Sequence, residues 1–212
     1  MVHIFVQNVR KNMIEKNKYM DSNKILKIEF EELHKALNIA KHDYHCFALA
    51  TTRLNIPQVR TVVLRSVNKK FNSITFHTDL RSQKINEINL NNEVSALFYD
   101  KKRKIQLRII GKAYVEKDST KLKNVWSSMK PESKLCYMGP FNPSKELDSF
   151  IPNLPNHNAQ NISDENNNLG YEHFCRITIK MENLEWLKLH HTGHKRILYS
   201  FIPKAKTQWI AT

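Results

Sequence analysis

The chain has 212 residues, of which 41% are hydrophobic and 25% are charged. These values describe a globular chain that can bury a core without disulfides or metal, and they exclude a disordered or fibrous protein. The 34 Lys and Arg residues outnumber the 20 Asp and Glu residues, so the formal net charge is +14, which favours polyanions or phosphorylated ligands as partners.

The three cysteines, Cys46, Cys136 and Cys175, are far apart and form no Cys-x-x-Cys pair, which predicts a reducing compartment. No apolar run approaches the roughly 20 residues of a membrane span. The first residues also lack the basic-then-apolar order of a signal peptide. The sequence therefore predicts a soluble cytoplasmic protein without a membrane partner.

The beginning of the chain divides into an arm and a helix. Residues 1–24 carry alternating charge and little periodicity, which predicts an N-terminal arm or irregular helix ahead of one domain over residues 25–212. From Ile28 onward the apolar residues have helical spacing, and the helix is expected to end near residues 41–42. The residues that set this spacing are Phe30, Leu33, Leu37 and Ala40.

A run of short extended segments follows this helix. Period-two alternation bounded by polar turns predicts an antiparallel meander of three strands over residues 44–52, 58–67 and 73–78. A short helix is then expected from Ser82, two more strands across the turn "KKRK", and a second helix over "STKLKNVWSSM".

The last third of the chain begins with an irregular stretch. Residues 139–170 hold most of the prolines and an Asn-rich segment, which predicts a surface excursion or a lid. The segments "HFCRITIK", "LEWLKLHH", "KRILYSF" and "QWIAT" then read as strands. Strands on both sides of the irregular stretch indicate one closed sheet.

The strand "VRTVVLRSV" contains two arginines. Arg60 and Arg65 are five residues apart, so in an extended chain their side chains point to opposite faces. Two arginines that only reach into water from the ends of a strand would also give this pattern.

The segment "FHTDLRSQK" passes from a strand that ends at Thr78 to a helix that begins near Ser82. A hydroxyl, Gln83 and Lys84 thereby come to a helix N-terminus, where free amides favour an anion, and Arg60 lies on the neighbouring strand. This is a phosphate site in outline. An ordinary Ser cap beside a surface lysine fits the segment as well.

The segment "KIQLRIIG" carries Gln106 within a strand of otherwise apolar character. A half-buried glutamine needs partners for its amide, and the edge of a ligand could supply them. A glutamine on an exposed strand face is the alternative.

The ordered set of VRTVVLR, FHTDLRSQK, FYDKKRKIQLRIIG and a tryptophan ten residues before an arginine resembles the pyridoxamine 5'-phosphate oxidase-like FMN-binding split-barrel flavoproteins. The resemblance covers roughly residues 44 to 201 and is closest to the uncharacterised flavin-binding branch of the family. It implies a mainly β fold with flanking helices (α+β), built on a six-stranded antiparallel split β-barrel. It also implies a homodimer with two FMN molecules in the grooves between the subunits.

The resemblance also implies a set of cofactor-binding residues. Three of its positions depart from the family pattern, with Arg65 in place of a lysine, His77 in place of a tyrosine and Gln83 in place of an arginine. Trp186 and Arg196 match the pair that closes the flavin site from the other subunit. The full set is Arg60, Val62, Val63, Leu64, Arg65, His77, Thr78, Ser82, Gln83, Lys84, Gln106, Trp186 and Arg196.

On the substrate side, the positions that hold phosphate donors in the oxidase correspond to Val125, Met129 and Ser133, and those near the late histidine to Thr192 and His194. Ser133 and His194 alone keep the family's residue. The sequence therefore predicts an FMN-dependent oxidoreductase acting on an unidentified small molecule, with pyridoxamine or pyridoxine 5'-phosphate oxidase in vitamin B6 metabolism as the alternative. No protein nucleophile or general base is assigned.

Other readings rest on single features. A metal site is suggested by the three histidines His190, His191 and His194. Gly193 and the strand pattern break the geometry that such a site requires, so no metal is expected. The net charge and the strand aromatics would also fit a basic nucleic-acid-binding module, a further alternative that is disfavoured because no RNA-binding signature occurs. A flavin or haem carrier without turnover stays open.

Overall fold

The structure is a computed structural model that describes residues 21–70, 72–155 and 162–212. Most of the predicted N-terminal arm, residues 1–20, lies outside the described residues, as does part of the predicted excursion. None of the helices in the described ranges is both long enough and apolar enough to cross a membrane.

The described chain alternates between strands and short helices. The helices are α2 (Ser22–Ala36), α3 (Gln83–Leu90), α4 (Ser119–Ser128), α5 (Pro131–Lys134) and α6 (Asp164–His173), with a 3₁₀ turn η1 at Leu135–Tyr137. The strands are β1 (Cys46–Arg53), β2 (Ile56–Asn68), β3 (Ser73–Asp79), β4 (Glu93–Asp100), β5 (Ile105–Val115), β6 (Phe174–Lys188), β7 (Lys195–Ser200) and β8 (Lys206–Ile210).

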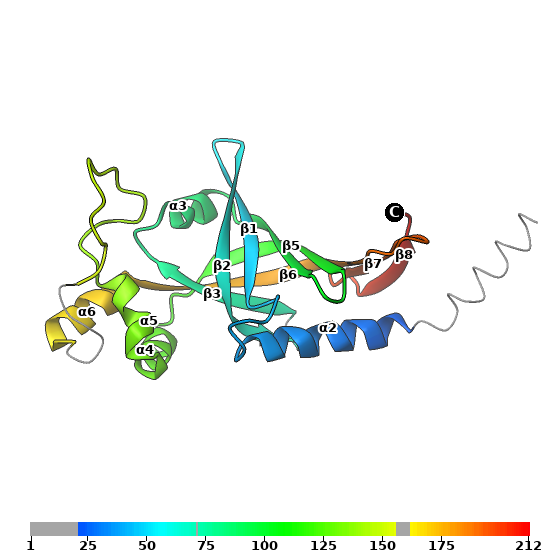
Figure 1. Ribbon diagram of the computed structural model, residues 1–212, viewed down its shortest axis with the longest axis horizontal. Helices are drawn as coiled ribbons and strands as arrows, with labels where there is room; N and C mark the ends of the chain where they lie inside the picture. Colours follow the sequence, from blue (N-terminus) through cyan, green and yellow to red (C-terminus); the bar gives the residue numbers. More distant parts are fainter. Residues whose placement is uncertain (1–20, 71, 156–161) are drawn as a thin grey trace, which may run out of the picture.

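Six of the strands form a closed antiparallel barrel with flanking helices, as the sequence predicts (Figure 1). They follow the order β3-β2-β1-β4-β5-β6, and pairing between β3 and β6 closes the ring. Strands β7 and β8 continue the sheet outward from β6. Closure leaves no free edge within the ring.

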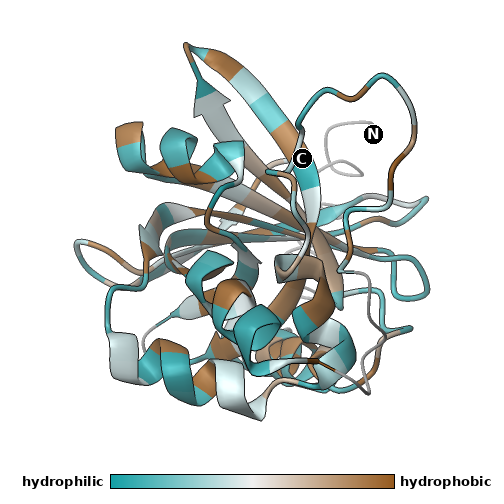
Figure 2. Ribbon diagram, turned by 90° about the vertical axis from the view of Figure 1, so that its left-hand side faces the viewer, coloured by the Kyte–Doolittle hydropathy of each residue, from teal (hydrophilic) through white to brown (hydrophobic). Residues whose placement is uncertain are grey.

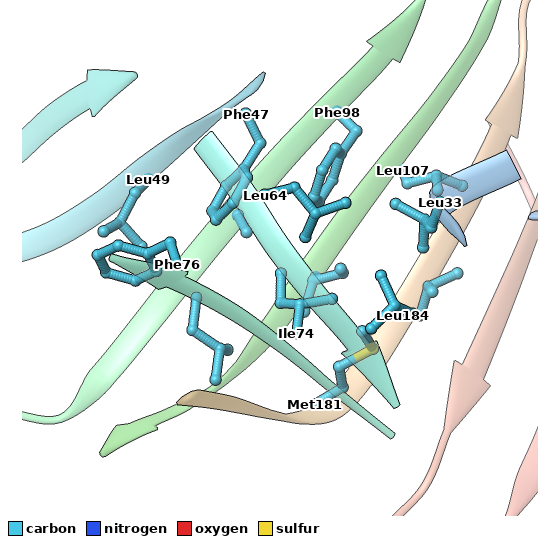
Figure 3. Close-up of a cluster of buried hydrophobic side chains, with 14 of the residues drawn as sticks. Leu33, Phe47, Leu49, Leu64, Ile74, Phe76, Phe98, Leu107, Met181 and Leu184 are labelled. Carbon is cyan, nitrogen blue, oxygen red and sulfur yellow. The ribbon is translucent and has the colours of Figure 1, made fainter. Parts of the chain in front are cut away.

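The barrel interior is filled by alternating apolar side chains. Strand β4 buries every second residue, because successive side chains point to opposite faces of a strand. Phe47 and Phe98 stack with ring centroids 4.7 Å apart, and leucines and isoleucines from the facing strands surround them (Figure 3).

Strand β6 is continuous, although its sequence reads as two separate segments. Its pairing with β5 shifts register between Ile110 and Gly111, so Glu182 is an extra residue at a bulge. A Cβ at position 111 would lie 2.0 Å from the Lys180 carbonyl oxygen, so only glycine permits this close approach. The bend lets one strand pair with β3, β5 and β7.

Helix α2 packs along one side of the barrel and begins six residues earlier than the spacing from Ile28 predicts (Figure 1). The Asp21 side chain caps it by accepting from the Asn23 amide at 2.9 Å. Its buried face starts at Ile25, and the helix ends at Ala36, so Ala40 lies outside it.

Helices α4, α5 and α6 form a small helical cap with its own apolar cluster. Trp126, Tyr137, Met138 and Phe174 are its buried members. Gly170 lies so close to them that a Cβ there would be 2.8 Å from Met138 and 2.9 Å from Trp126. Helix α6 occupies the end of the stretch predicted to be irregular. Apolar and polar residues alternate along the helices of the molecule (Figure 2).

Candidate functional site

A cationic site lies where β3 ends and α3 begins. The Lys84 ammonium donates to the Thr78 hydroxyl at 2.9 Å and to the Ser82 hydroxyl at 2.5 Å. Both hydroxyls are buried, and the Ser82 side chain makes no capping bond to the helix. The serine that the sequence marks as a cap therefore bonds to Lys84 instead.

Arg60 reaches the same region from β2. One terminal nitrogen donates to Glu87 at 2.8 Å, and the other donates to the Thr51 hydroxyl and to the Gln58 carbonyl oxygen at 3.3 Å. The Thr51 hydroxyl in turn donates to Glu87 at 2.5 Å. Strand β1, strand β2 and helix α3 are thereby joined around one carboxylate.

The charges of this region do not cancel pair by pair. Burial and then the charge of Arg60 lower the pKa of Lys84, while Glu87 and Asp79 oppose that shift. Asp79 is already paired with Arg81 at 2.7 Å. Two half-buried cations, Arg60 and Lys84, therefore share Glu87 as their main counter-ion.

This donor set fits a phosphate group. An ammonium and two hydroxyls meet at the first turn of α3, and Glu87 holds a guanidinium one turn further along the helix. Charged donors of this kind form the strong hydrogen bonds that phosphate oxygens accept. Gln83, which replaces an arginine of the family pattern, is exposed beside them.

The strand between the two predicted arginines turns its apolar side chains inward. Val62 and Leu64 are buried in the core, and Val63 is partly exposed on the opposite face. Arg65 is exposed at a register shift between Leu64 and Ser66, where β2 meets β3. Because the side chains of Val62 and Leu64 are buried, these two residues could face a ligand only with their backbone atoms.

His77 lies on β3 near Arg65. Burial, Arg65 and Arg176 together lower the pKa of His77 to about 3, so the ring is neutral at physiological pH. The centroid of its ring lies 4.9 Å from that of Phe174, in an edge-on arrangement. Its buried Nδ1 has no hydrogen-bond partner among the described residues.

Gln106 and Arg196 lie in one row across the outer face of the sheet. Leu187 of β6 pairs with Gln106 on one side and with Arg196 on the other. Arg196 donates to Glu185 at 2.8 Å, and its buried Nε has no partner in the described chain. Glu185 also accepts from Arg108 at 2.6 Å.

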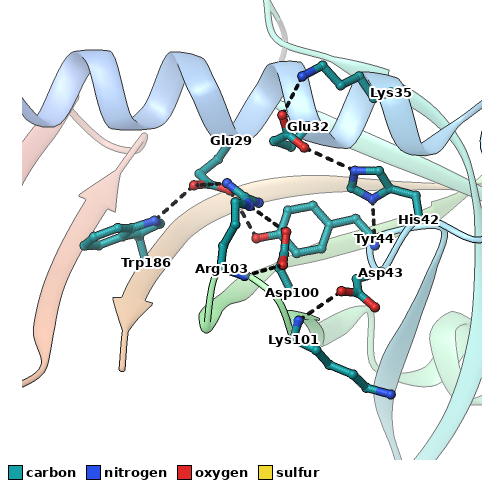
Figure 4. Close-up of polar contacts among 10 residues, drawn as sticks. All are labelled: Glu29, Glu32, Lys35, His42, Asp43, Tyr44, Asp100, Lys101, Arg103 and Trp186. Carbon is teal, nitrogen blue, oxygen red and sulfur yellow. Dashed lines mark hydrogen bonds and ion pairs between the residues drawn. The ribbon is translucent and has the colours of Figure 1, made fainter. Parts of the chain in front are cut away.

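Trp186 does not lie on this outer face, which corrects the expectation that it reaches a flavin of the partner subunit. It is only 2% exposed, and its indole nitrogen donates to Glu29 of α2 at 3.2 Å (Figure 4). Alternation along β6 sends Leu187 outward and Trp186 inward. The spacing of ten residues to Arg196 crosses a turn and so does not reveal the face.

The two substrate-side candidates lie apart from the cationic site. Ser133 is in α5 of the cap, and His194 is exposed in the β6–β7 connection, where its Nδ1 accepts from the His190 amide at 3.1 Å. No hydrogen bond or ion pair in the described ranges joins either residue to Arg60 or Lys84.

Sequence reasoning missed the carboxylates of the site. Glu87 binds Arg60, and Glu185 binds Arg196. The position of Glu87 between the buried residues Ile85 and Ile88 of α3 was the one available signal, because a charged residue there needs a buried partner.

The closed six-stranded barrel is the split-barrel fold of FMN-binding proteins, and it carries a cationic site at one helix N-terminus. Residues 27–117 match the family described as pyridoxamine 5'-phosphate oxidase, FMN-binding domain. This match agrees with the resemblance found in the sequence.

Relatives with known names agree with this placement. The chain is 35% identical over 105 residues to the pyridoxine/pyridoxamine 5'-phosphate oxidase of Pelagibacter ubique, a match that spans 49% of each chain, so it covers about half the length of this relative. Because that relative carries the oxidase name, the placement in a branch outside the oxidase proper stays a prediction.

Two solved structures share the fold. A pyridoxamine 5'-phosphate oxidase-related FMN-binding protein of Nostoc punctiforme has a TM-score of 0.65 at 18% identity, covering 91% of this chain and 99% of that one. PhzG of Burkholderia lata has a TM-score of 0.65 at 16% identity, covering 91% and 93%. At these identities the likeness is one of fold.

Proposed function

We propose that this protein is an FMN-binding flavoprotein that catalyses a redox reaction on a small molecule. The observation that carries the proposal is the cluster of Lys84, Ser82 and Thr78 at the start of α3, with Arg60 held beside it by Glu87, within a segment that matches an FMN-binding domain family. The flavin, when bound, supplies the electron transfer. The chain's own residues bind and orient it.

The cofactor is FMN and not FAD, because the cationic site suits a terminal phosphate and the sequence has no glycine-rich dinucleotide loop. Protein purified without added cofactor should release FMN on heating, identified by chromatography against both flavins. A clear majority of FAD, or no flavin after reconstitution, would contradict the proposal.

Several of the predicted residues have a role toward FMN in this proposal. Lys84 and Arg60 hold the phosphate, and Gln106 offers its amide to the ring edge. The inward-facing Val62 and Leu64 contribute backbone groups. His77, which stays neutral, lines the site without adding charge.

The active form is a homodimer with the flavin between subunits. Gln106 and Arg196 lie on either side of Leu187, so a two-fold axis along β6 would bring Gln106 of one copy opposite Arg196 of the other. Leu97, Tyr99 and Ile110 are exposed on the barrel surface. A monomer with fully bound FMN in sedimentation at micromolar concentration would contradict this arrangement.

Pyridoxamine or pyridoxine 5'-phosphate oxidation is the second candidate, supported by the name of the Pelagibacter relative. The cap argues against it, because Val125 and Met129 pack against its apolar cluster and Lys134 lies over the Trp126 ring at 5.2 Å. Aerobic turnover of both phosphates by the FMN-loaded protein tests it. A specificity constant within about tenfold of an authentic oxidase, a gap of about 1.4 kcal/mol, would establish this candidate.

A further inference from the structure

Glu87 lies in the middle of α3 and is 2% exposed. One of its oxygens accepts hydrogen bonds from Thr51 at 2.5 Å and from Arg60 at 2.8 Å, and Arg60 also donates to Thr51. A buried carboxylate is retained only when it is paired and hydrogen-bonded, and this triangle provides both.

Lys84 lies three residues before Glu87, on the same side of the helix. Its ammonium is held by the hydroxyls of Thr78 and Ser82, and no carboxylate of the described chain lies within ion-pair distance of it. Three elements besides α3 bring charged or titratable groups toward it, namely Arg60 on β2, Asp79 on β3 and Cys175 on β6.

Arg60 is the neighbour that disfavours a charged lysine, and the opposing contributions of Asp79 and Cys175 come after that of Glu87. Arg60 repels the ammonium, and burial raises the pKa of the Cys175 thiol to about 12, so that thiol is neutral. Asp79 is shared with Arg81, whose Nε and Nη2 both donate to its carboxylate. Glu87 is therefore the main anion that offsets the repulsion between Arg60 and Lys84, with a smaller contribution from Asp79.

We propose that Glu87 is a positioning residue, which fixes the Arg60 guanidinium and keeps Lys84 protonated so that both cations face an anionic ligand. Glu87 acts through these two side chains and does not itself contact the ligand. The identity of the ligand as FMN rests on the function proposed above, whereas the effect of Glu87 on Lys84 does not.

The substitution Glu87→Gln isolates the charge. A glutamine retains an oxygen that can accept from Thr51 and Arg60, but it no longer favours the protonated lysine. Lys84 should then lose its proton at a lower pH, and binding of a phosphate should weaken as the pH rises.

The experiment is an FMN titration at pH 7, 8 and 9 with the wild-type protein and Glu87→Gln. The dissociation constant of the variant should rise more steeply across this range than that of the wild type, by up to about tenfold, because one pKa unit is a factor of ten in proton affinity. Glu87→Asp, which keeps the charge, should follow the wild-type profile. Parallel profiles for Glu87→Gln and the wild type would overturn the proposal.

Two controls assign the effect. Glu29→Gln changes the other 2%-exposed glutamate that binds an arginine, and it should leave the pH profile of FMN binding as in the wild type. In the double variant Lys84→Ala with Glu87→Gln, the added pH dependence should disappear, because the lysine that titrates is gone. Its persistence would place the effect elsewhere and contradict the proposal.

A readout without flavin separates this inference from the proposed function. The Lys84 ammonium can be titrated by NMR in the FMN-free protein with ¹³C-labelled lysine, its signal assigned by comparison with Lys84→Arg. Its pKa should fall by about one unit in Glu87→Gln, the tenfold change in proton affinity expected above. An unchanged lysine pKa overturns the role of Glu87, whereas failure of the wild type to bind FMN at any pH overturns only the proposed function.

Discussion

Two glutamates of the described chain, Glu29 and Glu87, are only 2% exposed and each bind an arginine, and their surroundings differ. Glu29 of α2 accepts hydrogen bonds from both terminal nitrogens of Arg103 at 2.9 Å, from the Tyr44 hydroxyl at 3.1 Å and from the Trp186 indole nitrogen (Figure 4). Arg103 also donates to Asp100 at 2.5 Å, so acceptors are in excess there. Around Glu87 the cations are in excess, because Arg60 and Lys84 share it.

This difference separates a structural pair from a candidate binding site. Where two carboxylates bind one arginine, its charge is offset within the protein, and the network joins α2 to the turn between β4 and β5. Where cations exceed their counter-ions and bond to hydroxyls, an anion can complete the arrangement. The same pair of residue types thus has two roles, set by the number of neighbours.

The largest expected effect concerns the network around Glu29. Arg103→Ala should lower the free energy of unfolding by about 3 to 5 kcal/mol, because it leaves the buried Glu29 carboxylate without its cation. Urea unfolding at pH 7 measures this loss. A decrease below about 1 kcal/mol, the value of an ordinary exposed ion pair, would erase the distinction between the two glutamates.

On the ligand side, Lys84→Ala should weaken FMN binding by about 1 to 3 kcal/mol, the range for a hydrogen bond to a charged group. Calorimetric titration with FMN measures the change. Lys112→Ala is a matched control, because Lys112 is a lysine whose side chain is 39% exposed and which is paired with Glu93 at 3.3 Å, with no hydrogen bond or ion pair to Lys84 or Arg60 in the described chain. An equal loss in both variants would show only a general effect of net charge.

The neutral His77 should make this side of the molecule sensitive to acid. The pKa of His77 lies near 3 in the folded protein, and an unfolded histidine takes up its proton near pH 6.5, so the unfolded state binds the extra proton between these values. Stability should therefore fall as the pH drops from about 6.5 toward 3 and should not depend on His77 above about pH 7.5.

His77→Phe removes this proton uptake while retaining a ring against Phe174. Between pH 7 and pH 5 the variant should lose up to about 2 kcal/mol less stability than the wild type. Urea unfolding of both proteins at the two pH values is the measurement. Equal losses would mean that His77 takes up its proton in the folded state.

The smallest expected effect comes from an exposed pair beside the network around Glu29. Lys35 binds Glu32 at 2.6 Å, but the lysine side chain is 60% exposed. Lys35→Ala should therefore change the free energy of unfolding by less than about 0.5 kcal/mol, measured in the same urea series. A loss near that of Arg103→Ala would show that the network extends to the surface.

The strands could be predicted where apolar and polar residues alternate within one continuous segment of the sequence. The segment "EVSALFYD" buries every second residue and forms β4 as expected. The continuity of β6 could not be predicted, because the bulge at Glu182 depends on the close approach of Gly111 on another strand. The start of α2 was missed because its buried face begins at Ile25, before the spacing from Ile28 becomes visible.

The candidate site, like the strands, was predictable only where its residues lie close together in the sequence. Thr78, Ser82 and Lys84 lie within seven residues, and the structure brings them together. The role of Glu87 depends on Arg60, 27 residues away in sequence, so no local pattern contains it. The side of the strand on which Trp186 lies depends on burial against α2, which spacing alone does not encode.

Closure of the ring by β3 and β6 sets the order in which the chain can fold during synthesis. Thr75 and Thr178, whose side chains meet across this pairing, are 103 residues apart in sequence. A nascent chain exposes β3 and β5 as unpaired edges until β6 has left the ribosome, and slow, long-range pairing of this kind prolongs exposure to aggregation. Translation that stops before residue 174 would therefore leave an open, adhesive sheet, which makes the last third of the chain the part on which recovery of soluble protein depends.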